Sequence, residues 1–214
     1  MQLQSAIVPP PHIFESIYAA AQSIHLPPEP VAPGARSGLL QRLSRSQTKQ
    51  EAPASVSLTV VPAEHRFVRL TRFGNVGNED TETLGLALGI AAWDWPAPLV
   101  HIESLVIDKT VPTPVISAQL GGDTDGLRVI FRKILEVAQS QRFFLDRRIF
   151  HPEFPVAAVR MVDDAALRER LELENENFVG LEWQVTHFSL LTLSFGDTAQ
   201  TFEEFAVVPL GAAG

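Results

Sequence analysis

The sequence of 214 residues predicts an α+β protein, with antiparallel or mixed sheets and helices packed outside them. Segments whose apolar residues recur at helical spacing are interspersed with short runs typical of strands. Their order is strand–helix–strands in the first half and strand–helix–strand in the second, which is an α+β arrangement. Because 45% of the residues are hydrophobic, the chain can bury a substantial core, and we expect one domain over residues 1–214.

The first elements are a short buried strand at 5–9, ended by prolines, and an amphipathic helix at 12–24. One face of this helix collects Ile13, Ile17, Tyr18, Ala21 and Ile24. The next residues, 25–54, contain five prolines and many Ser and Gln residues. We interpret them as a long Pro-rich loop with a short helix near 38–43.

The remaining elements follow from the same two periodicities. Strands are predicted at 55–61, 66–73, 98–107, 114–120 and 154–161, with turns at 62–65 and 121–124. A helix opened by the cap Asn78 buries Leu84, Leu88 and Ala91. A second helix, the most regular of the chain, has one apolar face: Leu127, Ile130, Phe131, Ile134, Leu135 and Ala138. A charged helix at 163–175 precedes a closing hairpin of 183–194 with 201–210.

Composition limits the function classes. A formal net charge of −8 argues against a protein that holds nucleic acid in a global basic field, although a local basic groove stays open. The absence of cysteine excludes disulfides, thiolate metal sites and a Cys nucleophile. No apolar run reaches the ~18 residues of a membrane span, and no signal peptide pattern is present. We expect a cytoplasmic protein with no membrane association, metal or cofactor.

Two strand segments carry the most specific pattern in the chain. Residues 61–74 read V-P-A-E-H-R-F-V-R-L-T-R-F-G, and residues 148–157 read R-I-F-H-P-E-F-P-V-A. Both resemble the settings of the two catalytic strands in the 2H phosphoesterases, the family of RNA 2′,3′-cyclic phosphodiesterases and 2′-5′ RNA ligases. The family carries H-x-T on each strand. Aligned without gaps, the first His and Thr fall on Phe67 and Arg69, and the second pair fall on Glu153 and Pro155.

This resemblance covers most of the chain and rests on flanking residues, namely Val61, Pro62, Glu64, Gly74, Phe150 and Pro152. It implies a bilobal fold of two pseudo-symmetric lobes around a central groove, with the two strands facing each other across it. In the family one His acts as base and the other as acid on a phosphodiester, while the Thr hydroxyls hold phosphate oxygens. Imidazole suits this work because it titrates near neutral pH.

The first functional hypothesis is therefore a non-catalytic protein of this fold. Phe67 can neither accept nor donate the proton, and Pro155 offers neither a hydroxyl nor an N–H. Arg69 can hold a phosphate bidentately but cannot act as a base, and the carboxylate of Glu153 repels phosphate unless it is paired or protonated. We expect these four residues to line a groove that binds a nucleotide, an RNA end or a protein partner.

The alternative hypothesis is an active phosphodiesterase with relocated groups. His65 and His151 each lie two residues before an absent histidine, hence on the same strand face if the strands extend that far. With Glu153 they supply acid–base groups.

The segment His187-Phe-Ser189 also matches H-x-S, but we interpret it as polar positions of a half-buried strand. Alternation places Arg66 and Arg72 on one face of the first strand, opposite Arg69. A third hypothesis discards the resemblance and leaves an α+β domain of unknown role.

Overall fold

The computed structural model describes residues 1–24, 56–108, 113–143, 145, 149–161, 164–178, 180–195 and 200–211. The predicted loop at 25–54, with its short helix, lies outside these residues. The helices are α1 (Pro11–Ser23), α2 (Asn78–Ala91), α3 (Thr124–Ser140) and α4 (Asp164–Asn177), with short 3₁₀ helices η1 (Ala63–His65) and η2 (Ala92–Asp94). The strands are β1 (Gln2–Ile7), β2 (Val56–Val60), β3 (Val68–Asn75), β4 (Leu99–Asp108), β5 (Val115–Gly122), β6 (Glu153–Met161), β7 (Glu182–Gln184), β8 (His187–Phe195) and β9 (Gln200–Pro209).

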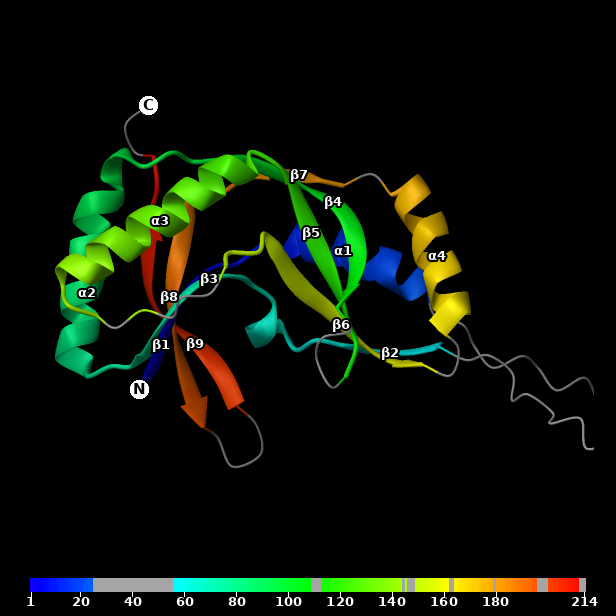
Figure 1. The fold of residues 1–214 in the computed structure, drawn as a ribbon, viewed down its shortest axis with the longest axis horizontal. Helices are drawn as coiled ribbons and strands as arrows, with labels where there is room; N and C mark the ends of the chain where they lie inside the picture. The colour runs from blue at the N-terminus through cyan, green and yellow to red at the C-terminus, as the bar shows by residue number, and fades with distance from the viewer. Residues whose placement is uncertain are drawn as a thin grey trace, which may run out of the picture.

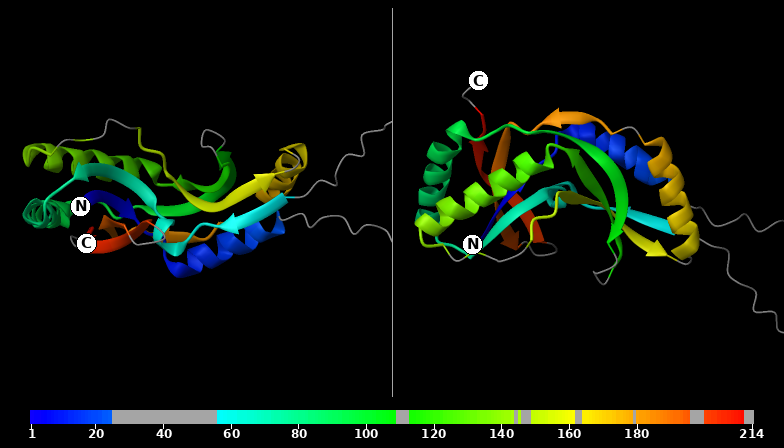
Figure 2. Two further views of the ribbon diagram at one scale, coloured as in Figure 1. Left: turned by 90° about the horizontal axis from the view of Figure 1, so that it is seen from below. Right: turned by 45° about the horizontal axis from the view of Figure 1, so that its top comes forward.

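The strands form two sheets, which confirms the α+β prediction. One sheet has the order β3-β1-β8-β9 and the other β2-β6-β5-β4-β7, and all pairs among the described strands are antiparallel. Figure 1 shows the sheets toward opposite ends of the long axis. Helices α2 and α3 contact the first sheet, and α1 and α4 contact the second (Figure 2). The arrangement is bilobal, and β3 contacts β6 where the lobes meet.

The helices form where the apolar periodicity predicted them. In α1, Ile13, Ile17 and Ala21 are buried, and in α3 the buried face is Leu127, Ile130, Ile134 and Ala138. The side chain of Asp123 caps α3 by accepting a hydrogen bond from the Gly126 amide at 2.8 Å. Three boundary predictions were wrong. The first strand is Gln2–Ile7 and not 5–9. Residues 121 and 122 end β5 and do not form a turn, and the N-cap of α2 is Gly77 and not Asn78.

The predicted strand 183–194 is in fact two strands in different sheets. β7 pairs with β4 in the five-stranded sheet, whereas β8 pairs with β1 and β9 in the other. The burial pattern marks the change: Trp183 and Val185 are buried, and the next buried side chain is Phe188, which is out of phase with them. The predicted hairpin at the end of the chain is confirmed as β8–β9.

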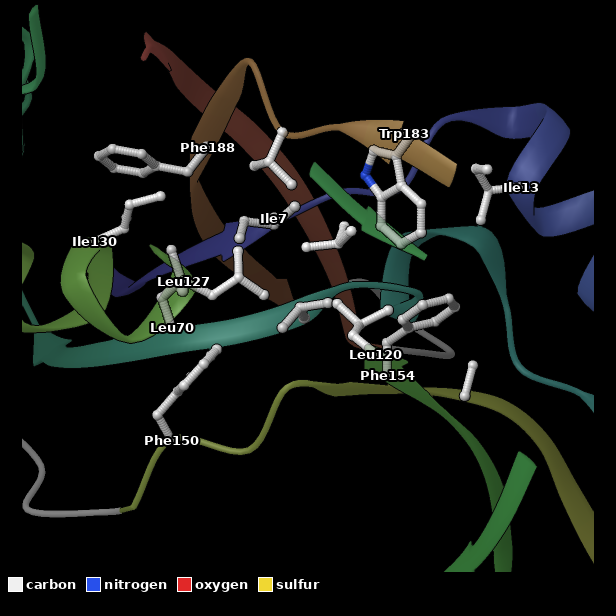
Figure 3. Packing of buried hydrophobic residues seen from close by; sticks show 14 of the residues in the cluster. Ile7, Ile13, Leu70, Leu120, Leu127, Ile130, Phe150, Phe154, Trp183 and Phe188 are labelled. Atoms are coloured by element: carbon white, nitrogen blue, oxygen red, sulfur yellow. The ribbon is translucent and has the colours of Figure 1, made fainter. Parts of the chain in front are cut away.

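One large hydrophobic cluster joins the two lobes. Figure 3 shows Phe188 and Ile130 of one lobe packed in the same cluster as Leu120 and Phe154 of the other. Because interiors are close-packed, this shared core fixes the two sheets relative to each other and therefore the walls of the space between them. Within the described part of the chain, none of the helices combines the length and the apolar character needed to cross a membrane.

Candidate ligand-binding groove

A cavity of about 350 Å³ lies where β3 and β6 approach each other. Its walls also take residues from β4, β5 and α3. All six residues selected from the sequence line it: Phe67, Arg69, Glu153, Pro155, His65 and His151. Its other polar lining residues are Thr71, Arg72, Asp108 and Ser117. The volume is within the range of small-molecule pockets, about 300–1,000 Å³.

Arg69 and Arg72 lie on the same face of β3, which corrects the alternation argument. In the pairing with β1, Ala6 is opposite Arg69, Ser5 is opposite Thr71, and the ladder shifts register between these two pairs. The extra residue at this shift is Leu70, so β3 has a β-bulge there. Ala6 and Gln4, which pair with Arg69 and Arg72, are two residues apart on β1 and share a face. The bulge therefore directs both guanidinium groups toward the same side.

Phe67 belongs to a small apolar cluster with Ala6 and Leu191, and only 5% of its surface is exposed. The Phe202 ring covers it in an edge-on contact, with ring centroids 5.1 Å apart. The Arg69 guanidinium lies 5.9 Å from the centroid of the Phe67 ring. Phe67, at the position where the resemblance places the first histidine, is thus part of a packed aromatic wall beside Arg69.

The opposite wall comes from β6 and β5. Glu153 pairs with Gln119 and Pro155 pairs with Ser117, so their side chains share the face that borders the cavity. The register shifts again next to Pro155, between its partner Ser117 and Ile116. Proline inside a sheet is tolerated at such irregularities because it has no N–H to donate.

The premise that the strands extend to His65 and His151 is wrong. His65 ends η1, three residues before β3 begins at Val68, and His151 lies in the loop before β6. Both nevertheless line the cavity, His65 from the end of η1 and His151 from the loop before β6. The His65 ring packs edge-on against Phe202 with centroids 5.3 Å apart, whereas His151 is exposed.

Arg66 lies outside the cavity. Its guanidinium is 4.3 Å above the Phe14 ring and its Nε donates to the Val61 carbonyl at 2.6 Å, so it does not line the cavity. His187 is also outside the cavity.

The sequence did not predict three of the lining residues, Asp108, Ser117 and Phe131, because they are far from both strand settings in the sequence. No group of three or more His, Asp or Glu side chains suited to a metal ion occurs in the described part of the chain.

Comparisons with known proteins bear on the fold. No family model matches the sequence, and no curated protein matches it either. Solved structures do match over nearly the whole length. E. coli LigT complexed with 3′-AMP has 19% identity and a TM-score of 0.60, with 98% of this chain and 97% of LigT covered. TT0787 of Thermus thermophilus has 16% identity and a TM-score of 0.57, with 98% of each chain covered.

A further structure, described as a phosphoesterase, has 17% identity and a TM-score of 0.59 over 98% of each chain. At these identities the likeness concerns the fold. The alignments leave out no large part of either chain. The chain therefore shares the fold of the 2H phosphoesterases, the family that its two strand settings resemble.

Proposed function

We propose that the cavity binds the phosphate of a nucleotide or RNA end, and that the protein does not perform the family reaction. The observation that supports this most is the bulge in β3, which brings Arg69 and Arg72 to one face beside the cavity. Guanidinium groups bind phosphate oxygens in bidentate fashion and stay charged at all working pH values. Neither can act as a general base, so the pair is suited to holding a phosphate and not to transferring its protons.

The charges of the two walls indicate how a ligand lies in the cavity. A phosphate is attracted to Arg69 and Arg72 on β3 and repelled by Glu153 on β6. Glu153 and the buried hydroxyl of Ser117 instead suit hydroxyl or amine donors, such as those of a ribose or a base. We infer that the phosphate lies against β3 and the nucleoside against β6.

The ligands of similar structures support a phosphate-containing ligand, since LigT structures also contain phosphate itself. LigT structures contain 3′-AMP, NADP⁺ and ATP, and each of these is a phosphorylated adenosine. A 3′-phosphate is also the chemical group at one kind of RNA end. We therefore choose 3′-AMP as the first ligand to test on this chain.

Arg69→Ala is expected to weaken 3′-AMP binding about ten- to one-hundred-fold, since a hydrogen bond to a charged group contributes about 1.5–3 kcal/mol. Isothermal titration at low salt measures this, because added salt screens the attraction. Arg160→Ala is the matched control: Arg160 is exposed on β6 and does not line the cavity. If the wild-type chain binds no 3′-AMP at low salt, the nucleotide proposal is wrong and a protein partner becomes the better hypothesis.

A second candidate function is phosphodiester hydrolysis, favoured by the presence of His65, His151 and Glu153 around one cavity. Hydrolysis needs one group to take a proton from water or a 2′-hydroxyl and another to protonate the leaving oxygen. One imidazole would take the first proton and the other would supply the second, and Arg69 would hold the phosphate between them.

Our proposal predicts that wild-type protein hydrolyses 2′,3′-cyclic AMP no faster than buffer. Chromatographic separation of the cyclic nucleotide from its 2′- and 3′-monophosphate products measures this. If hydrolysis occurs, the second candidate predicts that His65→Ala/His151→Ala reduces the rate at least about one-hundred-fold. Activity that persists unchanged in the double variant would exclude these histidines as the acid and base.

A further inference from the structure

Glu153 brings to the cavity a carboxylate that the described part of the chain does not use. Its neighbour Phe154 belongs to the core shared by both lobes (Figure 3), so strand alternation turns Glu153 to the opposite face of β6, where it lines the cavity. The side chain is half-buried, and among the described residues its carboxylate makes no hydrogen bond or ion pair. A half-buried charge without a partner loses hydration and gains nothing in return, so this carboxylate is suited to hold a ligand.

Gln119 on the neighbouring strand β5 supplies a hydrogen-bond donor beside this carboxylate. Gln119 and Glu153 are directly paired in the β5–β6 ladder, so their side chains share one face, with Cβ atoms about 5 Å apart. Gln119 is half-buried and does not itself line the cavity. Its Oε1 accepts a hydrogen bond from the Ser104 hydroxyl of β4 at 3.4 Å. This contact occupies the amide oxygen and leaves Nε2 to donate to a ligand.

Together the two side chains present one donor followed by two acceptors, because a carboxylate accepts through both of its oxygens. Guanine is the RNA base whose Watson–Crick edge has the complementary order, with the acceptor O6 followed by the N1–H and N2 amine donors. The edges of adenine and cytosine offer one amine donor next to a ring nitrogen that accepts, and uracil offers one N–H between two carbonyl oxygens. Each of these three bases would therefore leave at least one carboxylate oxygen unpaired or facing another acceptor.

An aromatic ring lines the same cavity and suits the flat face of a base. Phe131 of α3 is half-buried at the cavity wall. It stacks on the buried Phe150 ring, with centroids 5.4 Å apart and an interplanar angle of 19°, so its other face remains for the cavity. Aromatic stacking holds every base, because each base has a π face. Phe131 thus contributes affinity, whereas Gln119 and Glu153 can distinguish one base from another.

We propose that the cavity selects a guanine nucleotide. The Glu153 carboxylate accepts hydrogen bonds from N1–H and the N2 amine, Gln119 Nε2 donates to O6, and the base stacks on Phe131. This inference rests on the proposed function, which places the phosphate against β3 and the nucleoside against β6. The ribose is the competing partner for Glu153. A nucleoside 3′-monophosphate keeps only the 2′-hydroxyl on that part of the sugar, which would engage one carboxylate oxygen and leave the other unpaired.

Isothermal titration of the full chain at low salt with three nucleoside 3′-monophosphates tests the proposal. Guanosine 3′-monophosphate is expected to bind about ten- to one-hundred-fold more tightly than 3′-AMP, because its bonds to Glu153 are charge-assisted. Inosine 3′-monophosphate, which lacks only the N2 amine, should fall between them. Glu153→Gln should bring the guanosine and adenosine ligands to within about three-fold of each other. Glu182→Gln is the matched control and should keep the preference, since Glu182 is exposed on β7 of the same sheet and does not line the cavity.

The outcomes separate this inference from the proposed function. If the wild-type chain binds none of the three ligands, the proposed function fails and the guanine preference fails with it. Equal binding of all three would overturn the guanine preference and leave the phosphate site intact, and a preference that persists in Glu153→Gln would overturn the role of Glu153. The 2′-deoxy form of guanosine 3′-monophosphate should bind within about three-fold of the ribose form. A larger loss, without any preference among the bases, would assign Glu153 to the 2′-hydroxyl instead.

Discussion

Replacing Phe154 with alanine is expected to lower the free energy of unfolding by about 3–5 kcal/mol. The Phe154 side chain has no exposed surface and is among the largest fully buried groups of the chain. Its ring lies 5.7 Å from the Phe14 ring of α1, centroid to centroid. Phe154 of β6 thus packs against helix α1 and belongs to the core shared by both lobes (Figure 3). Truncation leaves a cavity that neighbours on two elements cannot close without moving.

Urea denaturation monitored by tryptophan fluorescence measures this loss. Phe205→Ala is the control, because Phe205 is 38% exposed on β9, and surface changes usually stay within about 0.5 kcal/mol. Phe154 also lies between Glu153 and Pro155, so its loss should weaken ligand binding in the cavity as well. A cost below about 1 kcal/mol would mean that the lobes do not share a tightly packed core.

The order and type of the elements could be predicted because each long element has a clear period. The apolar residues of α1 and α3 repeat at helical spacing, and both helices form within a few residues of the predicted limits. The resemblance supplied what periodicity cannot, namely that two strands far apart in the sequence meet at one cavity. Local pattern contains no information on such long-range pairing.

Two of the wrong predictions, the face of Arg72 and the single strand at 183–194, share one physical cause, which is backbone irregularity. Strand alternation assumes a regular ladder, and the bulge at Leu70 inserts one residue, which turns Arg72 to the face of Arg69. The break between β7 and β8 has the same character, because the chain leaves one sheet and enters another at Val185 and Thr186. Only the change of phase from Val185 to Phe188 signalled it in the sequence.

The packing around Phe67 could not be predicted from the motif positions alone. The resemblance places a histidine at position 67, and the phenylalanine found there packs against Phe202. That contact comes from β9, more than a hundred residues away, and it holds His65 as well. Phe67 is thus part of a packed aromatic contact that also includes Phe202 and His65.

Replacing both Arg69 and Arg72 with alanine is expected to reduce 3′-AMP affinity by about two to four orders of magnitude. Each guanidinium contributes a charge-assisted contact, and the bulge at Leu70 places both on the side of the cavity. The single variant Arg72→Ala tests the bulge, because regular strand alternation would place Arg72 on the face opposite Arg69 and away from the ligand. We expect its loss to be comparable with that of Arg69→Ala.

A double-mutant cycle read by calorimetry measures how the two side chains interact. If both contact one phosphate, the double variant should deviate from the sum of the single variants by about 0.5–3 kcal/mol, as groups that share a partner do. Arg66→Ala is the control: Arg66 is on the same chain segment but stacks on Phe14, outside the cavity. If Arg72→Ala is as neutral as Arg66→Ala, the phosphate does not lie against β3. A strict sum would place the two arginines on separate groups of the ligand, because a shared anion couples the charges that hold it.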